Sequence, residues 1–281
     1  EWGLSMRLDS TYRYPFNMTL GAIQDLKLIE KVGENMAKES KRMGIHFNFA
    51  PVLDINTNPK NPIIGNRSFG ENKTNVSNKA IALMKGVQGQ GVFATGKHFP
   101  GHGDTSADSH YTLPLVNFSK ERIDNIELYP YKRMFDEGLV SVMVGHLNIP
   151  SLETKENYPS SASYNVVTNV LQNQLGFDGL IITDGLAMKG ASNFKGPGDL
   201  ELAVLLAGND ILLCPENVPV AMTKLEASYS EGVITEERLA HSVKKILHYK
   251  FKSGLNSYKP VEMANLISDI NPSQNEALSY K

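Results

Sequence analysis

Cysteine, long apolar runs and surplus positive charge are nearly absent from this sequence of 281 residues. The single cysteine, Cys214, excludes a disulfide framework within the chain and a metal site built on several cysteines, although it does not fix the compartment. No run approaches the roughly 18 consecutive apolar residues of a membrane-spanning helix. The formal net charge of -2 argues against a nucleic-acid surface, which would need an excess of basic residues.

The two ends of the sequence are also informative. The first residues, Glu1-Trp2-Gly3-Leu4, are neither an initiator methionine nor a signal peptide, so we expect the chain to be cut from something longer. Residues 271–275 are polar and rich in turn formers, as at the edge of a domain.

Helical spacing of apolar residues alternates with short apolar runs along the chain. The runs predicted to be strands are residues 45–54, 91–98, 139–146, 179–184 and 210–214. The predicted helices are residues 20–43, 76–90, 120–137, 164–175, 198–207, 217–230 and 235–252, the last with an N-cap at Thr235. This alternation predicts an α/β fold in which helices cover parallel strands.

Polar side chains stand at the carboxyl ends of these strands, namely Asp54, Lys97, His98, His146 and Asp184. In a parallel barrel all such ends lie on one face, and that face holds the chemistry. The repetition is hard to explain by core packing alone. We therefore expect these side chains to meet at the mouth of a barrel.

The segment from Lys97 to His110 holds three histidines, two aspartates and two glycines, directly after a strand. Its proline and glycines prevent a helix, so we expect a structured loop. Asp108 and His110 are two residues apart, which in an extended stretch places both side chains on one side. A carboxylate beside an imidazole favours the protonated ring, which can donate a proton and take one back. The alternative is a pair of solvated loop residues.

Other candidates carry two interpretations each. Asp184 is a nucleophile pointing into the barrel mouth, or the N-cap of the next helix. Arg67 and Lys97 are donors to substrate hydroxyls, or surface charges. His98 is a member of the same site, or a satisfied core histidine.

A metal centre would draw its ligands from the same loop, from His98, His102, Asp104 and His110. The spacing of these histidines in a glycine-rich loop is not an established metal pattern. We therefore expect no bound catalytic metal.

Taken together, these segments resemble glycoside hydrolase family 3, and within it the bacterial β-N-acetylglucosaminidase branch, through most of the chain. The segment from Lys97 to His110 is similar to that branch's long and specific signature loop, Lys-His-Phe-Pro-Gly-His-Gly-Asp-Thr…Asp-Ser-His. Residues 66–70 are similar to the family's Asn-Arg-Ser-Phe-Gly segment, and Thr183-Asp184 with Leu186 and Met188 looks like the nucleophile segment. The resemblance implies a TIM-like (β/α) barrel, with residues 1–281 forming one catalytic domain that lacks its first strands.

The resemblance also implies a retaining exo-β-N-acetylglucosaminidase that hydrolyses terminal β-linked GlcNAc from peptidoglycan fragments. Asp184 would be the nucleophile, and His110 the general acid/base assisted by Asp108. The sugar would be held by Arg67, Lys97 and His98. No metal or organic cofactor is implied. The expected partner is a GlcNAc-containing muropeptide or disaccharide, with no nucleic acid, no membrane span and room for fused flanking domains.

The sequence departs from the family pattern in three places. Gly185 follows Asp184 where the family usually has a second aspartate, which should leave the nucleophile intact. Glu71-Asn72-Lys73 replaces a Glu-Asp-Pro helix start. The stretch from Glu1 to Arg7 resembles the tail of an Asp-x-Glu-Gly-Gly…Arg segment, so we expect a sugar-binding aspartate to lie outside this chain.

Three other functions compete with this one. A family 3 β-glucosidase typically has Asp-Trp at the nucleophile and lacks the Gly-His-Gly…Asp-Ser-His loop, whereas here Gly185 replaces the tryptophan and the loop is present. A non-catalytic carbohydrate-binding barrel would not need Asp108, His110 and Asp184 intact. A metallohydrolase would be sensitive to chelators.

Overall fold

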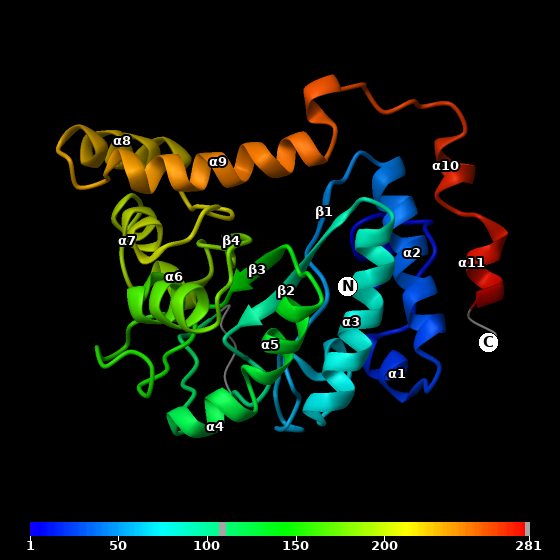
Figure 1. The fold of residues 1–281 in the computed structure, drawn as a ribbon, viewed down its shortest axis with the longest axis horizontal. Helices are drawn as coiled ribbons and strands as arrows, with labels where there is room; N and C mark the ends of the chain where they lie inside the picture. The colour runs from blue at the N-terminus through cyan, green and yellow to red at the C-terminus, as the bar shows by residue number, and fades with distance from the viewer. Residues whose placement is uncertain (107–110, 279–281) are drawn as a thin grey trace.

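The computed structural model describes residues 1–106 and 111–278, with a parallel β-sheet at its centre (Figure 1). The strands pair in chain order and are β1 (Phe47–Asn48), β2 (Phe93–Phe99), β3 (Ser141–Val144) and β4 (Leu180–Thr183). Ile211 extends the sheet beyond β4 through one parallel bridge to Ile182. Because consecutive strands pair and helices fill the crossovers, the predicted α/β fold with a TIM-like barrel wall is confirmed.

Helices surround the sheet in the described part of the chain. The α-helices are α1 (Asn17–Ala22), α2 (Leu26–Arg42), α3 (Lys73–Gly89), α4 (Lys120–Asn125), α5 (Tyr129–Asp136), α6 (Lys189–Ser192), α7 (Asp199–Ala207), α8 (Val218–Ser230), α9 (Glu236–Lys252), α10 (Leu266–Asp269) and α11 (Ser273–Leu278). A π-helix, η4, spans Asn165–Gln174, and 3₁₀ turns are η1 (Leu4–Met6), η2 (Gly65–Arg67), η3 (Ser160–Ala162) and η5 (Leu255–Ser257). None of the helices in the described residues is long and apolar enough to span a bilayer.

Two predicted helices are each divided in the structure. The helix expected over 20–43 is wrong as one element, because Asp25 accepts the N–H of Lys27 at 2.9 Å and starts a new helix there. The helix expected over 120–137 ends after α4, and α5 begins with Pro130 in its first turn. The N-cap predicted at Thr235 is confirmed, since its side chain accepts the N–H of Arg238 at 3.2 Å.

The strand predicted over 45–54 is much shorter in the structure. Only Phe47 and Asn48 form a regular ladder with β2. Pro51 has no N–H to donate, and beyond it the chain touches β2 through single contacts, such as the N–H of Leu53 to the carbonyl of Lys97 at 2.6 Å. The apolar run therefore forms a buried, irregular rim that carries Asp54 to the end of the sheet.

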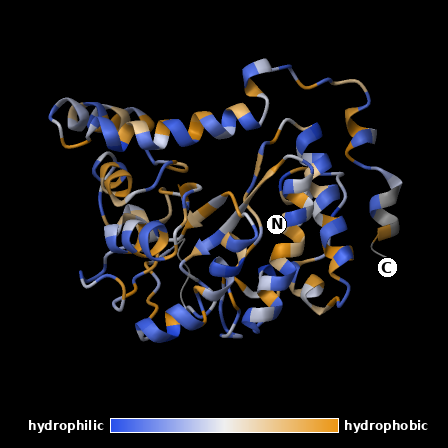
Figure 2. Ribbon diagram, in the orientation of Figure 1, coloured by the Kyte–Doolittle hydropathy of each residue, from blue (hydrophilic) through white to orange (hydrophobic). Residues whose placement is uncertain are grey.

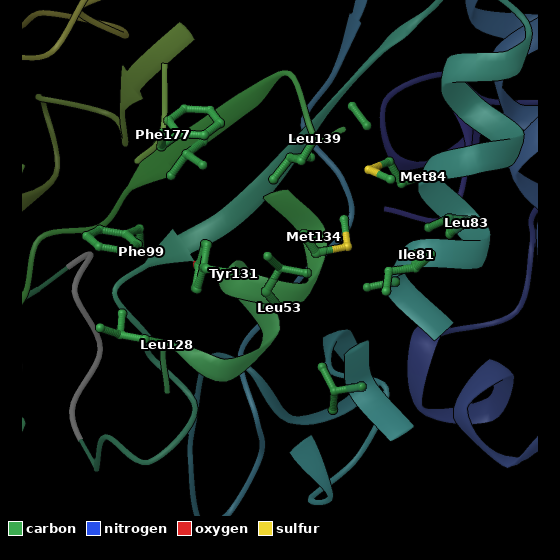
Figure 3. Packing of buried hydrophobic residues seen from close by; sticks show 14 of the residues in the cluster. Leu53, Ile81, Leu83, Met84, Phe99, Leu128, Tyr131, Met134, Leu139 and Phe177 are labelled. Carbon is green, nitrogen blue, oxygen red and sulfur yellow. The ribbon is translucent and has the colours of Figure 1, made fainter. Parts of the chain in front are cut away.

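The apolar core lies between the sheet and the helices α2, α3 and α5. Figure 3 shows Leu53, Tyr131 and Met134 at its centre, facing Leu83 and Met84 of α3. Hydrophobic and hydrophilic residues are interleaved along the helices, as expected when one side of a helix is buried (Figure 2). The sheet is thereby held rigidly beneath the residues that follow its strands.

Helices α2 and α3 approach each other very closely, and glycine makes this possible. A Cβ on Gly86 would lie 2.0 Å from the carbonyl oxygen of Glu30, and one on Gly33 would lie 2.4 Å from that of Leu83. Neither clash can be relieved by moving a side chain, because both involve backbone atoms.

The C-terminal segment, residues 255–278, returns along α2 (Figure 1). Arg42 of α2 pairs with Asp269 at 2.8 Å. Glu39, buried on the same helix, accepts hydrogen bonds from the Tyr14 hydroxyl and from the Asn275 amide, the latter at 2.5 Å. Burial raises the pKa of Glu39 to about 7, although both hydrogen bonds act in the opposite direction.

Candidate active site

A pocket of about 300 Å³, lined by both charged and apolar side chains, opens at the carboxyl ends of the strands. It brings together four of the residues predicted for the site, Arg67, Lys97, His98 and Asp184. The other two, Asp108 and His110, lie outside the described residues. The meeting of side chains from η2, β2 and the end of β4 is the arrangement expected of a barrel mouth.

Irregular backbone at the end of β2 presents two adjacent side chains to this pocket. Successive residues of a regular strand face opposite sides. Here the register between β2 and β3 shifts between Lys97 and Phe99. Lys97 and His98 both line the pocket as a result of this local geometry.

Glu1 links the two cationic side chains of the pocket. Its carboxylate accepts from Arg67 Nε at 2.9 Å and Nη2 at 2.7 Å, and from Lys97 Nζ at 2.7 Å. Burial alone would raise the pKa of Glu1, but Lys97 and Arg67 outweigh it and hold the pKa below its usual value. The ammonium of Lys97 has three donors, so its ion pair with Glu1 leaves donors for a substrate hydroxyl. The sequence offered one signal for Glu1, its spacing from Arg7.

His98 is fixed by a fully buried carboxylate, that of Asp54. Asp54 accepts the Nδ1 proton of His98 at 2.8 Å and the backbone N–H groups of His98 and His102 at 3.2 and 2.7 Å. Burial alone would raise the pKa of Asp54, but these partners outweigh it and keep the pKa low. Because a guanidinium can only donate, His98 Nε2 accepts from Arg67 Nη2 at 3.2 Å, which assigns the proton to Nδ1.

His102 forms the wall beside His98 and anchors the start of the signature loop. Its Nδ1 lies 2.6 Å from the hydroxyl of Thr105, and Asn61 donates to its carbonyl at 2.8 Å. Burial lowers the pKa of His102 to about 4, although the charge of Asp54 acts in the opposite direction. His102 is therefore an uncharged wall of the pocket near neutral pH.

Asp184 lies directly after β4 and is tied to the sheet through its backbone N–H, which donates to the carbonyl of Val144 at 2.8 Å. Its Oδ1 accepts the N–H of Gly185 at 2.8 Å, and no other described residue donates to this carboxylate. Burial alone would raise the pKa of Asp184, but His98, His146 and the Gly185 N–H outweigh it and hold the pKa below its usual value. The carboxylate is therefore ionised at neutral pH and accessible from the pocket.

The alternative interpretations of these residues fare differently. Asp184 is not a helix N-cap, because α6 begins at Lys189 and follows Met188. Lys97 is not a surface charge, since it is buried. His98 is satisfied by Asp54 and also lines the pocket.

Apolar residues of the pocket escaped the sequence analysis, among them Met143 and Leu213, which form parts of its wall. Asp54, expected at the mouth from its place at a strand end, lies beneath the pocket and positions His98. No group of three or more acidic, histidine or cysteine side chains among the described residues is arranged to hold a metal ion.

Comparison with known proteins gives one consistent family. Residues 1–249 match the model of the glycosyl hydrolase family 3 N terminal domain. The β-hexosaminidase A of Pseudoalteromonas piscicida is 33% identical over 84% of this chain and 43% of its own length. The β-N-acetylglucosaminidase/β-glucosidase of Cellulomonas fimi is 29% identical over 91% of this chain and 47% of its own.

The solved structures agree with the sequence relatives. A family 3 β-N-acetylglucosaminidase from Paenibacillus sp. str. FPU-7 superposes with a TM-score of 0.88 at 36% identity, covering 94% of this chain and 53% of that one. The chain thus spans about half the length of the relatives it matches. On the match over residues 1–249, the chain belongs to glycoside hydrolase family 3.

Proposed function

We propose that the protein is a retaining exo-β-N-acetylglucosaminidase. The observation that carries the proposal is the pocket in which an ionised, accessible Asp184 faces the hydrogen-bonding groups of Arg67, Lys97 and His98. In a retaining glycosidase a carboxylate attacks the anomeric carbon and a second group protonates the leaving oxygen.

Asp184 is the nucleophile in this proposal. One of its oxygens is oriented by the Gly185 N–H, and the other has no donor among the described residues. As the bond to the leaving oxygen breaks, the carboxylate forms a covalent bond to the anomeric carbon. Water then attacks that carbon, the carboxylate departs, and the two inversions retain the β configuration.

His110 and Asp108 are the proposed acid/base pair, on the strength of the signature loop that resembles the β-N-acetylglucosaminidase branch. His110 gives its proton to the leaving oxygen in the first step and takes one from water in the second. The anchored start of that loop supports this role. Thr105 Oγ1 contacts His102 Nδ1 at 2.6 Å, and Arg122 pairs with Asp104 at 2.6 Å.

The acid/base role is tested by varying the leaving group. His110→Ala should lose about 10²–10⁴-fold in the glycosylation step on natural disaccharides, whose alkoxide leaves poorly, and much less on activated aryl glycosides. Asp108→Asn should act in the same direction, more weakly, by lowering the pKa of His110. Equal losses on both substrates in single-turnover glycosylation would remove His110 from this role.

The sugar is proposed to be GlcNAc, from peptidoglycan-derived fragments. Relatives are named β-hexosaminidase and β-N-acetylglucosaminidase, which supports this choice. One relative carries both the β-N-acetylglucosaminidase and the β-glucosidase names, so β-glucosidase activity is the second candidate. Paired aryl β-glycosides of GlcNAc and glucose separate the two. A higher kcat/KM for the GlcNAc glycoside is expected, and a preference for glucose would overturn the assignment.

A further inference from the structure

A fully buried histidine, His146, lies next to the proposed nucleophile without lining the pocket. It follows β3, the strand that pairs with β4. Its Nε2 lies 3.0 Å from the carbonyl oxygen of Gly185, and its Nδ1 lies 2.8 Å from the hydroxyl of Ser161. Both ring nitrogens are thus engaged inside the protein.

The hydrogen bonds assign the proton on this ring. A carbonyl oxygen can only accept, so Nε2 must donate to Gly185. Burial lowers the pKa of His146, although Asp184 and the Gly185 carbonyl act in the opposite direction. In the uncharged ring Nδ1 then accepts from the Ser161 hydroxyl.

Ser161 is itself held firmly. It is fully buried in η3, and its carbonyl accepts the amide of Asn209 at 2.8 Å. The neighbouring Ser160 donates to the carbonyl of Gly145 at 2.7 Å, which ties η3 to the segment carrying His146. These contacts fix the backbone that carries the Ser161 side chain.

His146 donates its hydrogen bond to Gly185, a residue whose backbone is otherwise little restrained. Gly185 orients Asp184 through its N–H, yet glycine is the residue least restricted in backbone conformation. Neither space nor backbone demands a glycine there. Its φ is outside the left-handed region, and an added Cβ would meet only Met188, at 3.5 Å. A hydrogen bond to the Gly185 carbonyl supplies the restraint that a side chain would otherwise give.

We propose that His146 is a positioning residue that holds the peptide of Gly185, and through it the Asp184 carboxylate, with Ser161 selecting the donor tautomer. The inference rests on the proposed role of Asp184 as nucleophile. Misplacing a reacting group by about 1 Å can cost about 100-fold in rate. Loss of the His146 contact should therefore slow attack by Asp184 without weakening the grip on the sugar.

Two amide variants separate this role from core packing. The amide nitrogen of glutamine falls near the place of Nε2 and that of asparagine near Nδ1, so His146→Gln keeps a donor to Gly185 while His146→Asn does not. His146→Asn should lower kcat about 10–100-fold on an activated aryl GlcNAc glycoside, with KM within about twofold. His146→Gln should recover most of that loss. Equal losses in the two variants would overturn the proposal.

The rate of covalent trapping by a fluorinated GlcNAc donor gives the direct readout. In wild type the labelled residue is determined first, because a label away from Asp184 defeats the proposed function itself. With the label at Asp184, equal trapping rates in the two variants would defeat only the role of His146. If His146→Asn does not fold, Ser161→Ala replaces it and should slow trapping several-fold. An unchanged trapping rate there would contradict the proposal.

Discussion

Two aspartates at opposite ends of β4, the half-buried Asp184 and the buried Asp210, show how the fold separates the proposed chemistry from stability. Asp184 lies at the carboxyl end of β4 and accepts one hydrogen bond, from Gly185, among the described residues. Asp210 directly precedes Ile211, the residue that makes the single parallel bridge to Ile182 of β4. It accepts from the N–H of Ile181 at 3.0 Å, from Ser242 at 2.5 Å and from Lys245 at 3.3 Å.

The two carboxylates differ in how many of their oxygens remain free to contact a substrate. Every oxygen of Asp210 is used by the protein, so this carboxylate joins β4 to α9 and can do nothing else. Asp184 keeps an oxygen without a described donor at the pocket, and a group that reacts must be left incomplete in this way. In barrels the carboxyl ends of the strands carry catalysis and the amino ends carry stability.

The largest expected effect comes from replacing Asp184, the aspartate with the proposed chemical role. Asp184→Ala should lower kcat by on the order of 10⁴–10⁶-fold, since no other group can form the covalent intermediate. The free energy of unfolding should change by less than about 1 kcal/mol, because few contacts are lost. Steady-state kinetics and denaturant unfolding on the same preparation check both halves. Large destabilisation would make Asp184 a structural residue.

Asp210→Ala should give the reverse pattern. Three buried or partly buried donors lose their acceptor, and removing one partner of a buried ion pair costs about 3–5 kcal/mol. The exposed fraction of the Lys245 side chain is 14%, which places the expected loss near the lower bound. Activity per folded molecule should stay within about twofold of wild type. Thermal unfolding together with active-site titration measures this, and a stable but inactive variant would contradict the division.

Asp54→Asn sharpens the comparison. Asp54 lies on the pocket side of the sheet, like Asp184, yet both of its carboxylate oxygens accept hydrogen bonds from the protein, like those of Asp210. Its hydrogen bond to Nδ1 fixes the His98 tautomer. Replacing the carboxylate should raise KM about tenfold, equivalent to the loss of one substrate hydrogen bond of about 1.4 kcal/mol. The rate of the chemical step should fall less. If kcat falls while KM is unchanged, Asp54 acts on the reaction and not on sugar binding.

Glu39 gives a carboxyl group on α2, away from the pocket, and its effect appears only in the pH dependence of stability. Its pKa in the folded protein is about 7, above the usual value of 4.5, so folding favours its protonated form. This contribution to stability is full below about pH 4.5 and is lost as the pH rises toward 7. Glu39→Gln should therefore flatten the decline of stability between those pH values, by about 2–3 kcal/mol. Urea unfolding at pH 5 and pH 8 checks this, and Tyr14→Phe is the control that keeps the carboxyl group.

Local patterns predicted much of the fold, and four of the residues proposed for the site line one pocket. The apolar run ending in Asp184 became β4, and the run ending in Lys97-His98 became β2. Such patterns report only on neighbours along the chain. Asp54 and His98 are 44 residues apart, and Glu1 and Arg67 are 66 apart, so no periodicity signals these pairs. The division of the helix at Asp25 escaped for another reason, because the apolar spacing continues across the cap.

The most direct test of the account is the identity of the residue that carries the covalent intermediate. A GlcNAc donor with fluorine at C5 and a good leaving group should accumulate the glycosyl-enzyme, because fluorine slows both steps and the good leaving group restores the rate of the first step only. Proteolysis and mass spectrometry should locate the sugar on the peptide containing Thr183-Asp184-Gly185. Fragmentation should place it on Asp184. A label on any other carboxylate, or full turnover with no trapped sugar in the wild-type enzyme, would contradict the claim that Asp184 is the nucleophile.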